Sequence, residues 1–224
     1  MLQVDSVRHK LPELKNPRAK KRPLYTVVLV DTFSIIFFSC ICFIIVNLPA
    51  YLHIIKYKLD PDQVLSESPE VNFTQQVEYP QPTSLENNRL IIPAIGVSAP
   101  IIWDVSADES VEKLQQGVIH INSTGKPNEN KNVFLSGHSS NYWWREGDYN
   151  SVFALLPQLS EGNEVFVIYE NIIYKYIIDS REEVEKNASS KFLNFDSSRL
   201  TLMTCTPVGT NLKRLVIGAA PSDN

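Results

Sequence analysis

Cysteine is scarce in this chain, which has three cysteines among its 224 residues. Cys40 and Cys42 lie in an apolar run near the N-terminus, and only Cys205 lies outside that run. If the residues after the run are exported, Cys205 has no intramolecular disulfide partner in its compartment, which excludes a disulfide framework. The thiol is then either a reactive group or a small buried hydrophobe, and the cysteine alone does not decide between them.

Basic residues are few beyond the first 23 positions. Residues 1–23 contain seven Lys or Arg and two acidic residues, a net charge of +5, so the remainder must carry −9 to give the formal total of −4. This acidic remainder lacks a basic patch with interleaved aromatic residues. Nucleic acid is therefore excluded as an expected partner.

Charged residues are missing altogether between Thr32 and Ile55. About 20 apolar residues cross a bilayer as a helix, so we predict a transmembrane helix region over 24–55. A cleaved signal peptide is the alternative, but the run is long for one and no clear cleavage site follows it. The basic flank predicts that residues 1–23 are a cytoplasmic tail and that the chain after about residue 56 lies outside the membrane.

Long parallel βαβ units and internal repeats are missing from the rest of the chain. Residues 56–88 are polar and contain four prolines, which is typical of a linker. Residues 89–220 contain short β-rich runs separated by turn signals, with helical patches at 110–116 and 152–156. We therefore predict an all-β domain over 89–220, a closed antiparallel β-barrel with short helices.

Strand alternation places Cys205 on the outer face of that barrel. Leu200 and Leu202 are the apolar pair of one strand and should face the core, so Cys205 points to the opposite face. In the next strand residues 215 and 217 are the apolar pair, which puts Arg214 on the same outer face if the two strands pair. A guanidinium beside a thiol favours the thiolate and can bind an oxyanion, whereas the alternative is an ordinary solvated charge.

Cysteine catalysis also needs a proton carrier, and the chain has four histidines. The predicted topology puts His9 in the cytoplasm and His53 at the membrane interface, away from Cys205. His120 lies within a regular strand, where it is expected to be packed and hydrogen-bonded. His138 follows a strand end, and Gly137 before it allows an unusual backbone turn, so the sequence favours His138 at the rim.

Residues 89–218 resemble the sortases, the membrane-anchored cysteine transpeptidases of bacterial surfaces. The specific part of the resemblance is the Thr-Leu-Met-Thr-Cys segment at 201–205 with Arg214 downstream. Leu-Ser-Gly-His at 135–138 and the strand-like segment at 90–101 also match. The apolar anchor followed by a polar linker fits the layout of this family.

The resemblance implies a role for each candidate residue. Cys205 would attack the carbonyl of a sorting-signal peptide, typically of the Leu-Pro-x-Thr-Gly type, and form an acyl-thioester. His138 would protonate the leaving amine and deprotonate the incoming one, and Arg214 would hold the peptide or the oxyanion. Thr204 would add a contact to that oxyanion.

The implied partners are surface proteins that bear sorting signals and an amine acceptor, either a cell-wall peptide or a pilin lysine. No cofactor and no metal are implied, and the implied location is the bacterial cell surface. The segment from Cys205 to Thr210 resembles the pilus and sporulation-type branches. The Asp-Pro-aromatic lid of pilus-assembling sortases is not matched, because Asp62 follows Pro61, so the subclass stays open.

Two other functions stay open on the sequence. One is a different extracytoplasmic cysteine acyltransferase, such as a peptidoglycan L,D-transpeptidase, whose usual Ser-His-Gly-Cys type of motif is missing here. The other is a non-catalytic binding module on a degenerate barrel of the same fold.

Overall fold

The structure is a computed structural model, and it describes residues 24–61, 87–142, 144–193 and 197–222. The predicted tail at 1–23 and most of the predicted linker at 56–88 lie outside these ranges. The chain divides into two compact units, one ending at Ile41 and the other beginning at Cys42.

Two helices cover the predicted transmembrane region over 24–55, and the second continues to Leu59, into the predicted linker. Helix α1, Leu24–Val46, includes a span from Val28 to Val46 that is long and apolar enough to cross a membrane. Helix α2, Leu48–Leu59, follows after Asn47. Pro49 lies in the first turn of α2, and its ring nitrogen cannot donate the hydrogen bond that would continue α1. One continuous apolar run is therefore divided by a single proline.

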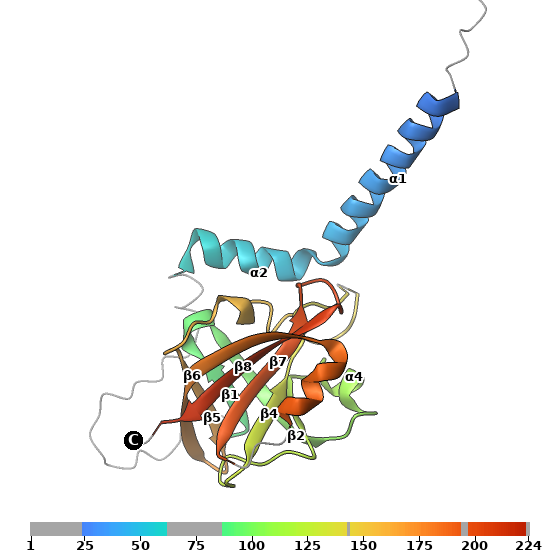
Figure 1. Cartoon of the computed structure of the whole chain (residues 1–224). Helices are drawn as coiled ribbons and strands as arrows, with labels where there is room; N and C mark the ends of the chain where they lie inside the picture. Colours follow the sequence, from blue (N-terminus) through green and yellow to red (C-terminus); the bar gives the residue numbers. More distant parts are fainter. Residues whose placement is uncertain (1–23, 62–86, 143, 194–196, 223–224) are drawn as a thin grey trace, which may run out of the picture. The chain divides into compact units, whose positions relative to one another are not determined.

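The second unit is built on a closed β-barrel, which confirms the predicted fold class (Figure 1). Its strand order is β1-β2-β3-β4-β7-β8-β6-β5, and β5 pairs with β1 to close it. The strands are β1 Arg89–Ile92, β2 Val97–Val105, β3 Val118–Ile121, β4 Asn132–Ser136, β5 Glu164–Tyr169, β6 Ile172–Glu185, β7 Arg199–Thr206 and β8 Lys213–Pro221.

The sequence pattern predicted an antiparallel barrel, but two of the strand pairs are parallel. Strand β2 pairs with β3 in parallel, and β4 pairs with β7 in parallel. The segment between β2 and β3 contains α4, Ser110–Lys113, and returns the chain to the starting end of the barrel. Strand β7 reaches β4 only after the whole β5–β6 hairpin, so no local pattern indicates its direction.

Short helices connect the strands. They are α4, in the predicted patch at 110–116, and the 3-10 helices η1 Pro93–Ile95, η2 Leu156–Gln158 and η3 Lys186–Phe192. The predicted patch at 152–156 consists of turns that lead into η2.

Aliphatic side chains fill the barrel interior. Leu200 and Leu202 of β7 are fully buried, as are Leu215 and Ile217 of β8. The alternation predicted for these two strands is therefore confirmed. It fixes the outer face as the one on which residues 205 and 214 lie.

Candidate active site

Strand β7 lies between β4 and β8, the strands that lead to His138 and carry Arg214. In the parallel β4–β7 pair, Ser136 is level with Met203. His138 follows two residues after Ser136, just beyond the end of β4. In the antiparallel β7–β8 pair, Cys205 lies directly opposite Arg214. Cys205 and Arg214 thus lie opposite each other on β7 and β8, and His138 follows the end of the neighbouring strand β4 by two residues.

The backbone that leads to His138 is fixed to β7 by two hydrogen bonds. The Gly137 N–H donates to the Met203 carbonyl at 3.1 Å, and the Thr204 hydroxyl donates to the Gly137 carbonyl at 2.8 Å. The Thr204 side chain is buried in the core row of β7. The residue next to Cys205 therefore holds the backbone next to His138.

Gly137 is required for a reason other than the one predicted. Its φ is not among the positive values of the chain, so the expected unusual backbone turn is wrong. A Cβ at this position would lie 2.6 Å from the Cδ2 atom of Phe153. The Phe153 N–H also donates to the His138 carbonyl at 2.9 Å. Close packing against a buried ring excludes larger side chains here.

The His138 imidazole is half-buried and faces a poorly solvated environment. Burial lowers the pKa of His138 below its usual value, which favours the neutral ring. Its Nε2 atom is buried, and no described residue hydrogen-bonds to it. A neutral ring nitrogen with a free position can accept a proton from a thiol and give it to an amine.

Cys205 and Arg214 share the outer face, as strand alternation predicts. Side chains directly opposite in an antiparallel pair have Cβ atoms about 4.5–5.5 Å apart, which brings the guanidinium within reach of the thiol. The Arg214 guanidinium donates to the Lys213 carbonyl at 3.0 Å. The Cys205 thiol donates to Asn211 Oδ1 at 3.6 Å. Sequence reasoning did not select Asn211, although it lies in the connection between the two strands that carry Cys205 and Arg214.

The loop between β7 and β8 is also tied to the loop that follows His138. The Gly209 N–H donates to the Ser140 hydroxyl at 3.0 Å. Gly209 has a φ of 86°, which a glycine adopts without strain. Two loops that follow candidate catalytic residues are therefore joined at one end of the barrel.

Two exposed aromatic residues follow His138 in the sequence. The rings of Tyr142 and Trp144 stack with centroids 4.7 Å apart and an interplanar angle of 7°. Both rings are about half exposed. The stacked rings therefore present an apolar surface to solvent. Trp143 lies outside the described residues.

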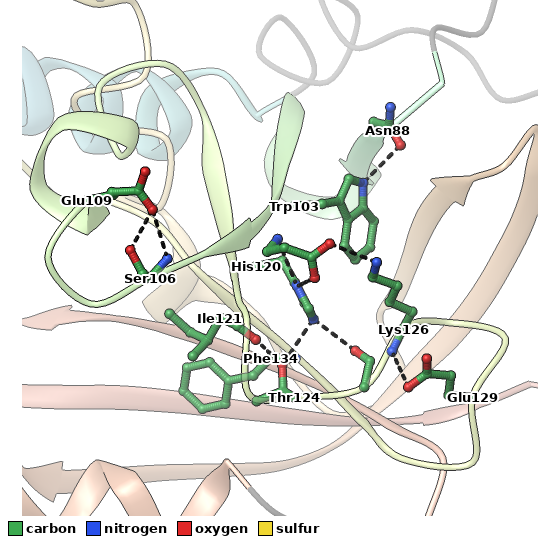
Figure 2. A network of polar contacts seen from close by, with 12 residues as sticks. Asn88, Trp103, Ser106, Glu109, His120, Ile121, Thr124, Lys126, Glu129 and Phe134 are labelled. Carbon is green, nitrogen blue, oxygen red and sulfur yellow. Dashed lines mark hydrogen bonds and ion pairs between the residues drawn. The ribbon is translucent and has the colours of Figure 1, made fainter.

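The other candidate histidine, His120, is fully buried in a separate polar network (Figure 2). Its Nδ1 accepts a hydrogen bond from the Asp104 N–H at 3.3 Å, and its Nε2 donates to the Gly125 carbonyl at 2.9 Å. Burial lowers the pKa of His120, so the ring is held neutral in one tautomer. Trp103 packs on the ring at 4.9 Å between centroids. Both ring nitrogens are engaged, which confirms the packed, hydrogen-bonded environment expected for this position.

Within the described ranges, no group of three or more His, Cys, Asp or Glu side chains is arranged to hold a metal ion. Two acidic residues of β6 lie near lysines. Glu182 pairs with Lys191 at 2.7 Å, and Glu185 lies 3.8 Å from Lys213.

Comparison with known proteins gives one consistent family. The family model described as the Sortase domain matches residues 90–222, more than half of the chain and the range that contains all the candidate residues. Sortase D of Bacillus subtilis (strain 168) is 30% identical over 132 residues, which are 57% of this chain and 60% of that protein. This chain thus spans less than two thirds of that relative.

Solved structures agree on the fold. Sortase C-1 from Actinomyces oris matches with a TM-score of 0.53 and 26% identity, over 61% of this chain and 73% of that one. Sortase A from Corynebacterium diphtheriae matches with a TM-score of 0.51 and 22% identity, over 61% of this chain and 60% of that one. The latter likeness shows the fold alone.

Proposed function

Because this chain belongs to the sortase family, we propose that it is a cysteine transpeptidase that cleaves a sorting-signal peptide and transfers it to an amine. The observation that carries the proposal is the pairing of Cys205 opposite Arg214, with His138 just beyond the end of the neighbouring strand β4. A nucleophile, a proton carrier and a cation at one end of the barrel suit acyl transfer. The register thus supports a reaction, beyond the resemblance in sequence.

The first half of the reaction is acylation of Cys205. Its sulfur attacks the carbonyl carbon of the threonine in a Leu-Pro-x-Thr-Gly-like signal, and the thiol proton passes to the neutral His138 ring. The Arg214 guanidinium stabilises the oxyanion; losing one such donor typically costs about 10²–10³ in rate. The His138 imidazolium then protonates the leaving amine, the C–N bond breaks and a thioester remains.

The second half returns the enzyme to its starting state. An acceptor amine enters, and the neutral His138 ring takes a proton from it as its nitrogen attacks the thioester. The new amide forms, and the C–S bond breaks. The proton on His138 returns to the Cys205 sulfur. Burial of the ring suits this cycle because it keeps His138 neutral between turnovers.

For Thr204 the proposal departs from the oxyanion role implied by the resemblance. Its hydroxyl is buried and already donates to the Gly137 carbonyl. We assign it a positioning role, in which it holds the His138 backbone beside β7.

The proposed partners are surface proteins with sorting signals and an amine acceptor, a cell-wall peptide or a pilin lysine. The proposed location is the bacterial cell membrane, crossed once by α1. Residues 1–23 are placed in the cytoplasm because their charge of +5 favours that side. The barrel is then extracytoplasmic.

Trapping the thioester tests the function. The full chain is incubated with a Leu-Pro-x-Thr-Gly peptide without an acceptor amine, and intact mass spectrometry should show an adduct equal to the peptide up to threonine. The Cys205→Ala variant should stay folded and form no adduct. A non-catalytic binding module would bind the peptide without an adduct, and that result would reject the proposal. Turnover by the Cys205→Ala variant would reject it equally.

A further inference from the structure

Helix α2 packs against the barrel through one of its faces. Residues spaced three or four apart are buried or half-buried on that face: Asn47, Ala50, Tyr51, Ile54 and Tyr57. The Tyr57 hydroxyl donates to the Ala94 carbonyl of η1 at 3.1 Å, and the Tyr51 hydroxyl lies 3.5 Å from the Val208 carbonyl oxygen. Ile54 and Tyr57 also pack against the barrel core.

These contacts fall at the end of the barrel that carries the candidate active site. Val208 is three residues after Cys205 and precedes Gly209. A Cβ on Gly209 would lie 2.9 Å from the Asn47 side chain, so the loop touches the start of α2 closely. Gly209 in turn donates to Ser140, two residues after His138. The helix is thus fixed to the loops that follow Cys205 and His138.

The opposite face of α2 is apolar and exposed. Its members are spaced four, three and four residues apart, so they form one stripe along the helix. Their exposed fractions run from 43% to 80%, in Leu48, Leu52, Ile55 and Leu59. Lys56 follows Ile55 and Lys58 precedes Leu59, so one lysine falls on each side of the stripe.

We propose that this stripe, Leu48, Leu52, Ile55 and Leu59, lies in the headgroup and acyl boundary of the membrane, so that α2 is an interfacial helix. The proposal rests on the proposed membrane span of α1. That span ends at Val46, two residues before α2 begins, so the chain cannot carry the start of α2 away from the bilayer surface. Lysines beside an apolar stripe suit phosphate headgroups, and their stems can lie along the acyl boundary.

Helix α2 would then contact the membrane and the barrel at the same time. Its stripe contacts lipid, and its opposite face contacts the loop after Cys205. The candidate active site is thereby held on the order of 10–20 Å from the bilayer, one to two helix diameters. The barrel is carried on the membrane rather than left free on a long tether.

Photocrosslinking in a bilayer tests the proposal. The photoreactive amino acid benzoylphenylalanine replaces Leu52, or Ile55 in a second variant, in the full chain in nanodiscs of phosphatidylglycerol and phosphatidylcholine. The positive control is the same replacement at Ile36 within α1. The matched control is Ile172, a similarly exposed aliphatic residue at the β5–β6 turn. This turn lies next to the Arg89 end of β1, whereas η1, which contacts α2, follows the other end.

We expect lipid adducts at positions 52 and 55 in yields within about threefold of position 36, and at least tenfold below that at position 172. Adducts at position 36 alone would overturn the interfacial helix and leave the α1 span standing. Adducts at none of the positions would remove the span and the interfacial helix together. Equal yields of lipid adduct at positions 52 and 172 would also overturn the interfacial helix. A chain–chain adduct at position 52 would overturn it as well and assign the stripe to a second copy.

Discussion

Single residues at the end of the barrel that carries the candidate site divide into those proposed to react and those that hold the backbone in place. His138 has a buried ring nitrogen to which no described residue hydrogen-bonds, whereas His120 uses both nitrogens within the fold. A ring nitrogen without a hydrogen-bond partner is free to exchange a proton. A fully bonded ring is committed to structure.

Replacing His138 should therefore mainly lower activity, whereas replacing His120 should mainly lower stability. His138→Ala should lower kcat by roughly 10²–10⁴, the usual contribution of a general acid–base. His120→Ala leaves the Asp104 N–H and the Gly125 carbonyl without partners, so it should cost about 1–3 kcal/mol of stability and little activity below its melting temperature. Steady-state transpeptidation and thermal melting check both. A crippled His120→Ala enzyme beside an active His138→Ala enzyme would reverse the assignment.

Thr204 is expected to act through the backbone of its neighbour. Thr204→Val removes the hydroxyl while keeping the shape, so the buried Gly137 carbonyl loses its donor at a cost of about 1–3 kcal/mol. Displacement of His138 should then shift the pH profile of Cys205 alkylation by iodoacetamide, a reaction that forms no oxyanion. Thr204→Ser should restore the profile. A lowered kcat with an unchanged alkylation profile would instead support an oxyanion contact.

At the scale of elements, β7 organises the site because it pairs with β4 on one side and β8 on the other. Its short connection to β8 places Arg214 opposite Cys205. Its parallel pairing with β4 brings in His138 from more than sixty residues earlier in the chain. The end of β4 therefore sets the position of His138, the proposed proton carrier.

Gly137, just after β4, gives a test at the same scale. Gly137→Ala would drive a methyl group into the Phe153 ring, and overpacking of this kind typically costs about 1–3 kcal/mol. Because the strain falls beside His138, kcat should drop by more than the fraction of unfolded protein explains. Combining Gly137→Ala with Phe153→Leu should recover part of both losses, which melting curves and turnover assays would show. If the double variant behaves as the sum of its parts, Phe153 is not the reason for the glycine.

For the whole molecule, the proposed topology separates the three cysteines. Cys40 and Cys42 lie in α1, within the proposed membrane span, and Cys205 lies on the barrel. A membrane-impermeant maleimide should therefore label intact cells through Cys205 alone, and Cys205→Ala should abolish the signal. Mass spectrometry of the purified chain identifies the labelled residue. Labelling of Cys205 only after cell lysis would place the barrel in the cytoplasm and overturn the orientation.

Much of this protein was determined by local sequence pattern. The uncharged run predicted an apolar helix, and the alternation of Leu200 and Leu202 put Cys205 on the outer face. The end of a strand marked His138 as a rim residue. These features depend on composition and on periods of two or 3.6 residues, which can be read from neighbouring positions.

Only the tertiary structure decided which distant residues meet. The parallel β4–β7 register, the bond from Thr204 to Gly137 and the contact of α2 with the Val208–Gly209 turn join segments that are far apart in the chain. Their alignment is set by barrel closure and by packing around Phe153, neither of which has a local period. The sequence therefore selected the candidate residues, while the barrel pairing placed Cys205 opposite Arg214 and brought the end of β4 beside β7.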